Sequence, residues 1–128
     1  MIRNTSLTVA VAVVGLTIGL AACGSDDPAN PSESNALIDR GADVYAESCA
    51  SCHGADLRGT DKGPSHLSIV YEPDHHTDDS FRGAIANGAP QHHWNFGDMP
   101  AVEGVTGGDV EAVIAFVRAE QERQGFEQ

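Results

Sequence analysis

Residues 49–53 read Cys49-Ala50-Ser51-Cys52-His53, and this stretch decides how the rest of the chain is interpreted. Two cysteines three positions apart, followed at once by a histidine, form the pattern of a c-type haem attachment site. On a turn of helix the two sulfur atoms lie on one side of the backbone, where they can bond to the two vinyl groups of haem. The next residue, His53, can then present a ring nitrogen to the iron. The stretch therefore predicts one covalent haem c, attached through Cys49 and Cys52.

The same five residues are compatible with a disulfide or buried thiols, with half of a zinc site, and with a thioredoxin-like redox pair. A zinc site needs a second ligand pair at regular spacing. The chain has no second cysteine pair, and its remaining histidines do not have the usual H-x₃₋₅-H spacing: His66, His75, His76, His92 and His93. A thioredoxin-like pair expects a strand–helix–strand pattern, and none surrounds this one. The context favours haem.

The N-terminus has the pattern of an export signal. A polar lead with one cation, Arg3, precedes an uncharged apolar stretch at 7–20, which is too short for a comfortable membrane span. The stretch ends at Leu20-Ala21-Ala22-Cys23-Gly24, which resembles the bacterial lipobox. This resemblance implies a signal peptide over 1–22 and a lipid thioether on Cys23. The alternative is an ordinary signal peptide followed by an incidental cysteine.

Residues 23–34 are rich in Pro, Ser and Asp and contain no large apolar side chain. Such a composition cannot bury a core, so it predicts a flexible tether. Residues 35–128 remain as one folded domain. Two of the three cysteines are assigned to haem and one to lipid, which leaves no thiol for a disulfide. A domain this small needs another source of apolar mass, and a buried porphyrin would supply it.

Helical periodicity predicts three helices, at about 35–50, 78–87 and 107–124, and no convincing strand. Ser34 or Asn35 can cap the first helix, which leads directly into the cysteine pair. Thr106 and Asp109 match a loose capping box at the start of the third. The segments between the helices are long and rich in Gly and Pro. Loops of that length are unusual in a compact domain unless they serve a function, such as wrapping a cofactor.

The second axial position of the iron needs a candidate. Met99 is the only methionine that remains once Met1 leaves with the signal peptide. It lies in a loop between Gly97 and Pro100, whereas a methionine that fills a core more often lies on the apolar face of a helix. We therefore predict His53 and Met99 as the axial ligands. The competing second ligands are His66, His92 and His93, which would give a lower reduction potential.

Two pairs of adjacent histidines, His75–His76 and His92–His93, could instead bind a surface metal ion. Histidines in polar loops are more often simply solvated, and the sequence alone does not separate these two interpretations.

The combined pattern is similar to the class I cytochromes c and covers nearly all of the predicted domain. The residues that carry the resemblance are Gly41, Tyr45, Cys49, Cys52, His53, Gly63-Pro64, Leu67, Met99-Pro100 and Phe116. The resemblance implies a small all-α fold of about three main helices, with long loops wrapped around one haem. It also implies that Gly41 and Tyr45 meet Phe116 where the first helix crosses the third.

The same resemblance implies roles for individual pocket residues. The Pro64 carbonyl would accept a hydrogen bond from His53 Nδ1 and so orient the imidazole. Leu67, Trp94 and Phe96 would line the haem pocket. Trp94 would either donate its indole N–H to a haem propionate or only fill space, and the sequence favours neither role.

The chain carries a net charge of −12, which becomes −13 when Arg3 leaves with the signal peptide. Such an acidic chain is a poor binder of nucleic acid or anionic membranes, and it suits a redox partner with a basic or neutral docking surface. Solubility alone explains the acidity equally well. Many members of the family have a lysine-rich rim around the haem edge, but Lys62 is the only lysine here. A partner that docks through acidic patches is therefore not expected.

These observations predict a monomeric one-electron carrier rather than an enzyme. Lipid would hold it on the extracytoplasmic side, as a periplasmic or cell-surface lipoprotein. The alternatives are a haem subunit of a larger redox enzyme, a haem enzyme, or a gas sensor with a labile sixth ligand. An enzyme needs an open iron position with an acid–base group above it, and His92 or His93 would supply that group if Met99 were not bound.

Overall fold

The computed structural model describes residues 30–127; the predicted signal peptide, Cys23 and most of the predicted tether lie outside them. The described residues form α1 (Pro31–Ser48), α2 (Ala50–His53), a short 3-10 helix η1 (Ile69–Tyr71), α3 (Asp78–Asn87) and α4 (Gly108–Gln124). Within this range the only strand-like pairings are two isolated bridges, Ser68 with Glu127 and Ala89 with Met99. The predicted all-α class with three main helices is confirmed. None of the described helices is both long and apolar enough to cross a membrane.

The first helix starts earlier than the sequence predicted. α1 begins at Pro31, within the segment expected to be tether, rather than at Asn35. Asn30 caps it, since its side-chain oxygen accepts a hydrogen bond from the Ser32 N–H at 3.2 Å. Proline suits the first helical position because its missing N–H would have no partner there. The segment whose composition predicted a linker thus also contains Asn30 and Pro31, which are suited to begin a helix.

The first helix also ends earlier than predicted. α1 stops at Ser48, and the haem-attachment residues form the separate single turn α2. Cys49 joins the two, donating its N–H to Tyr45 O at 2.9 Å and accepting that of His53 at 3.0 Å. Gly54 then ends α2 with φ 79°. The cysteine pair and His53 are therefore held on one continuous hydrogen-bonded path from α1.

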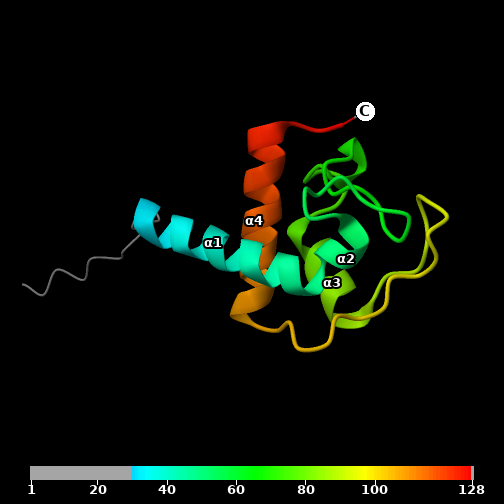
Figure 1. Ribbon diagram of the computed structural model, residues 1–128, viewed down its shortest axis with the longest axis horizontal. Helices are drawn as coiled ribbons and strands as arrows, with labels where there is room; N and C mark the ends of the chain where they lie inside the picture. The colour runs from blue at the N-terminus through cyan, green and yellow to red at the C-terminus, as the bar shows by residue number, and fades with distance from the viewer. Residues whose placement is uncertain (1–29, 128) are drawn as a thin grey trace, which may run out of the picture.

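α1 crosses α4, and this crossing forms the frame of the domain (Figure 1). A Cβ atom at Gly41 would run into the Ala112 carbonyl and lie 2.7 Å from Phe116 Cβ, so only glycine permits the approach. The Tyr45 and Phe116 rings pack beside it with centroids 5.4 Å apart. This is the meeting of Gly41, Tyr45 and Phe116 that the resemblance implies.

The expected capping box at the third helix does not form. Gly107 occupies the cap position of α4 without a side-chain hydrogen bond. The Asp109 carboxylate instead accepts from Arg40 Nε at 2.8 Å and so links α4 to α1. The arginine lies far away in sequence, so local spacing could not reveal this competing partner.

The hydrophobic core lies under the crossing and extends to α3 and to the loop that follows α2. Its buried members are Tyr45, Leu57, Leu67, Phe81, Ile85, Val105, Val113, Ile114 and Val117. α3 occupies 78–87 as predicted and ends at Gly88 with φ 77°. The C-terminal segment returns to the long loop, where Glu127 N–H donates to Leu67 O at 2.6 Å.

Candidate functional site

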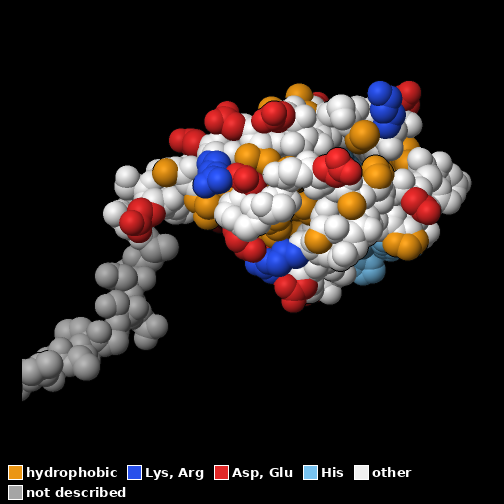
Figure 2. Space-filling model, turned by 90° about the horizontal axis from the view of Figure 1, so that it is seen from below, with side chains coloured by type: hydrophobic (Ala, Val, Ile, Leu, Met, Phe, Trp, Pro, Cys, Tyr) orange, Lys and Arg blue, Asp and Glu red, His pale blue; other side chains and the backbone are white. Residues whose placement is uncertain are grey.

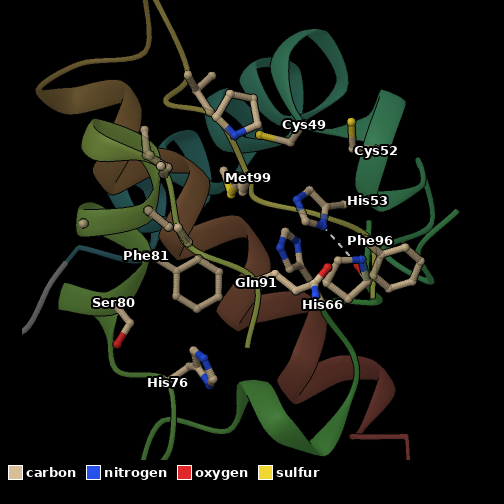
Figure 3. A pocket seen from close by; sticks show the side chains of 18 of the residues that line it. Cys49, Cys52, His53, His66, His76, Ser80, Phe81, Gln91, Phe96 and Met99 are labelled. Atoms are coloured by element: carbon tan, nitrogen blue, oxygen red, sulfur yellow. Dashed lines mark hydrogen bonds between the residues drawn. The ribbon is translucent and has the colours of Figure 1, made fainter. Parts of the chain in front are cut away.

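A cavity of about 650 Å³ lies between α2, α3 and the two long loops (Figure 3). Of the residues predicted to hold the haem, all except Leu67 line it: Cys49, Cys52, His53, Pro64, Trp94, Phe96 and Met99. Phe81 and Ile85 from α3 and Val113 from α4 complete much of its apolar wall. The fold therefore brings together residues from both ends of the domain around one apolar space.

His53 is buried, and a hydrogen bond from its ring to the backbone holds the side chain in place. Its Nδ1 lies 3.0 Å from the Pro64 carbonyl oxygen, which can only accept, so Nδ1 carries the proton. This leaves a lone pair on Nε2, the atom that a metal ion would bind. Burial lowers the pKa of His53, although the hydrogen bond to Pro64 partly opposes that effect. The hydrogen bond thus fixes the ring, and the lowered pKa favours the neutral form that could bind a metal ion through Nε2.

Gly63 lets the Pro64 loop come this close to α2. A Cβ atom at this position would lie 3.0 Å from the Cys52 carbonyl oxygen and 3.3 Å from Cys52 Cβ. Any larger residue would push the Pro64 carbonyl away from the imidazole that it orients. The Gly63-Pro64 pair therefore serves the geometry of His53.

Cys49 and Cys52 are half-buried free thiols on the wall of the cavity. Burial, with a smaller effect of the neighbouring Cys52, raises the pKa of the Cys49 thiol to about 11. Cys49 therefore keeps its proton at neutral pH. A protonated thiol has the S–H bond that adds across a vinyl group to form a thioether.

His66 has a role that the sequence did not reveal. Its buried ring stacks on the ring of His53, with centroids 4.1 Å apart and planes 18° apart. Tyr45 OH lies 3.3 Å from its Nδ1, and its backbone carbonyl accepts from Gln121 Nε2 at 2.7 Å. Two axial ligands point at an iron from opposite sides, whereas His66 lies beside His53. His66 therefore packs directly against the side of the His53 ring, and it also lines the cavity.

Met99 is held on the cavity wall by its backbone. Its N–H and carbonyl both pair with Ala89, each at 2.9 Å, so the loop between these two residues is closed at its base. Figure 3 shows the Met99 side chain at the cavity with those of Cys49 and His53. The residue is half-buried, as a side chain facing such a space would be.

The two aromatic residues of the same loop lie near the mouth of the cavity. Trp94 stacks on Tyr71 with centroids 5.8 Å apart and planes 17° apart. Phe96 also lines the cavity but is 41% exposed. Together they give the loop an apolar inner surface.

Leu67 lies outside the cavity, unlike the placement that the resemblance implies. It is fully buried in the hydrophobic core. Its N–H donates to Ser65 Oγ at 3.1 Å, and its carbonyl accepts from Glu127 N–H. These bonds hold Leu67 in the core beside the C-terminal segment.

The groups around the cavity fit haem c. Cys49 and Cys52 supply two thiols from one turn of backbone. His53 supplies an imidazole whose Nδ1 is held by the Pro64 carbonyl, and the walls are largely apolar side chains. Hydrophobic walls around a few well-placed polar groups are what a cofactor site requires. Within the described residues, no buried side-chain polar atom lacks a hydrogen-bond partner.

Comparison with known proteins agrees with this geometry. The family model for cytochrome c matches residues 38–120. Cytochrome c-551 of Bacillus subtilis (strain 168) is 32% identical over 117 residues, which cover 88% of this chain and 93% of that protein. The family match begins within α1 and ends within α4, so it includes the crossing helices, the attachment residues and the cavity walls. The chain belongs to the cytochrome c family and carries covalent haem c at Cys49, Cys52 and His53.

Proposed function

We propose that this cytochrome c is a one-electron carrier whose haem iron is held by His53 on one side and Met99 on the other. The observation that carries the proposal is that both side chains line one apolar cavity while hydrogen bonds fix their positions. The stacking of the His66 ring beside that of His53 supports this pair, because two axial ligands approach an iron from opposite sides.

When bound, haem c takes up and releases one electron as its iron alternates between Fe(II) and Fe(III). The chain's own residues determine how easily this occurs. The soft sulfur of Met99 favours Fe(II) and raises the reduction potential, while Pro64 keeps the His53 imidazole in one orientation. The apolar walls keep water away from the site. With both axial positions filled by side chains, no position is open for a substrate, which suits a carrier rather than an enzyme.

The test is a volume-conserving replacement of the proposed ligand. Met99→Leu keeps the bulk of the side chain but removes the sulfur. We expect the red absorption band of a methionine–iron bond to vanish from the oxidised protein. The potential should fall by on the order of 0.1 V or more, since axial ligands set haem potentials over a wide range. Optical redox titration of the holoprotein measures both effects.

His92→Ala and His93→Ala are the matched comparisons, because these residues are the remaining competitors. An unchanged spectrum in Met99→Leu, together with an altered one in either histidine variant, would assign the sixth position to histidine. Rapid CO binding to the reduced wild-type protein, or turnover of peroxide, would favour the sensor or the enzyme instead.

We also propose that lipid on Cys23 holds the domain at the extracytoplasmic face of a membrane. The support is the sequence Leu20-Ala21-Ala22-Cys23-Gly24 directly after an apolar run. Cys23→Ser should release the cytochrome from the membrane fraction and abolish labelling by a fatty acid, because the lipid is attached through that sulfur. Ser25→Ala, which leaves Cys23 in place, should remain membrane-bound. Continued lipid labelling of Cys23→Ser would disprove the anchor.

The redox partner is proposed to have a basic or neutral docking surface. The chain has 19 acidic residues against seven basic ones. Figure 2 shows acidic side chains spread over the face in view, with few basic ones between them. Complementary charge would speed the encounter of the two proteins more than it would tighten the complex.

A further inference from the structure

Four histidines meet at the rim of the haem cavity, although they come from two separate loops. They are His75 and His76, just before α3, and His92 and His93, after it; we call them the histidine cluster. His75 Nε2 lies 3.2 Å from His93 Nε2, and His76 Nε2 lies 3.3 Å from His92 Nε2. Three of the residues bring ring nitrogens within 4.8 Å of one another: His75, His76 and His93. Figure 2 shows histidine atoms gathered at one place on the surface.

The contact between His76 and His92 identifies what this cluster requires. His76 Nδ1 lies 2.7 Å from the Val70 carbonyl oxygen, and His92 Nδ1 lies 2.7 Å from the Pro90 carbonyl oxygen. A carbonyl oxygen only accepts, so each Nδ1 carries the proton of its ring. In the neutral tautomer each Nε2 then bears a lone pair. As neutral rings, the two Nε2 atoms therefore cannot hydrogen-bond to each other, and both are available to a metal ion.

A metal ion can bind to the Nε2 lone pairs that neutral imidazole rings present. The spacing within each of the two histidine pairs is that of neighbouring ligands at a tetrahedral metal site. With metal–nitrogen bonds of about 2.0–2.1 Å, neighbouring ligand nitrogens of a tetrahedron are about 3.3–3.4 Å apart. The two measured pairs are 3.2 and 3.3 Å apart. Carbonyl oxygens that accept the other ring N–H, as at His76 and His92, are the usual outer partners of metal-bound histidines.

We propose that the histidine cluster binds one Zn(II) ion, or another first-row ion that prefers imidazole nitrogen, at a site separate from the haem iron. The ion would join the loop that carries Met99 to the loop before α3. Arg118 already holds the loop before α3 in place, since it donates to Tyr71 O at 2.7 Å and to His76 O at 2.5 Å. The metal therefore attaches a surface loop of the haem pocket to a part of the fold that α4 holds in place.

Zinc counting on the mature holoprotein tests the site. The protein is dialysed against low-micromolar free zinc, and zinc and iron are then measured in the same sample. Because each chain carries one haem iron, the iron content gives the protein concentration. We expect one zinc per iron and a rise in the melting temperature, because a ligand that binds only the folded state stabilises it. His75→Ala and His93→Ala, one from each loop and both exposed, should each weaken zinc binding at least tenfold.

The control is Asp74→Asn, which removes an exposed carboxylate next to His75 but no imidazole. It should retain zinc. Absence of zinc from the wild-type protein, unchanged binding in both histidine variants, or equal loss in Asp74→Asn would each overturn the site. A changed haem spectrum in His93→Ala would assign that residue to iron and also overturn it. The zinc measurements do not depend on Met99 being the iron ligand, so loss of the zinc site would leave the Met99 proposal standing. Only the assignment of His93 to iron would overturn both proposals.

Discussion

At the scale of single residues, Arg118 does more for the site than its sequence position suggests. Its guanidinium donates to Asp78 Oδ1 at 2.8 Å, Gln121 Oε1 at 2.8 Å, and the carbonyls of Tyr71 and His76. It also lies 4.9 Å from the centre of the Phe81 ring. One side chain on α4 thereby fixes the start of α3 and the loop before it. In the sequence it is one of several polar residues in a helix, with nothing to single it out.

We expect Arg118→Ala to destabilise the holoprotein by roughly 2–4 kcal/mol, because several half-buried acceptors lose their donor at once. Arg118→Lys should recover only part of this, since one ammonium cannot reach acceptors arranged for a planar fork. Denaturant unfolding followed by the haem absorbance measures both.

Arg123→Ala is the control for this prediction. Arg123 is exposed and pairs only with Glu120 on the same helix, so its loss should have no measurable effect. If Arg118→Ala and Arg123→Ala behaved alike, the proposed bracing role of Arg118 would be wrong.

At the scale of elements, the crossing of α1 and α4 determines where the haem-attachment turn lies. α2 follows α1 directly, so the placement of α1 on α4 also places Cys49, Cys52 and His53. The family resemblance implied that Gly41 lies where the first helix crosses the third, and a glycine inside a helix needs a packing reason. Only the tertiary structure shows that the reason is the Ala112 carbonyl.

Gly41→Ala should therefore destabilise the protein by at least about 2–3 kcal/mol, since its Cβ would overlap a backbone carbonyl that cannot rotate away. Gly108→Ala is the matched control: its Cβ would meet only Arg40 Nη1 at 3.7 Å, an ordinary contact. We expect the control to be neutral or stabilising by up to about 1 kcal/mol. Thermal unfolding of the two holoproteins decides, and equal melting temperatures would contradict the close-approach argument.

At the scale of the whole molecule, the described residues carry an excess of negative charge. Of the six basic residues in the described part of the chain, five form ion pairs: Arg40, Arg58, Arg82, Arg118 and Arg123. Their positive charges are thus neutralised locally. The long-range field of the molecule comes from the carboxylates that remain.

Oxidation of the reduced cytochrome by small complexes of opposite charge measures this field. The rate with a cationic cobalt(III) complex should fall severalfold as salt is raised, because screening removes the attraction. The rate with anionic hexacyanoferrate(III) should rise instead. The same salt dependence for both oxidants would mean that the haem edge does not lie in a negative field, and a basic partner would lose its support.

The sequence alone determined the features that depend on neighbouring residues. The spacing of Cys49, Cys52 and His53 predicted the haem, and helical periodicity predicted the helix at 78–87. The start of α1 was missed because proline and asparagine are common both in flexible linkers and at the first positions of helices.

The tertiary structure decided every feature that depends on which distant segments meet. It placed Leu67 in the core, stacked His66 on His53, and turned Asp109 from a cap into a partner of Arg40. It also brought together two histidine pairs, one before α3 in the sequence and one after it. Helix propensity and motif spacing act over a few residues. Contacts between distant residues depend on how whole elements pack, and no short stretch of this chain encodes that packing.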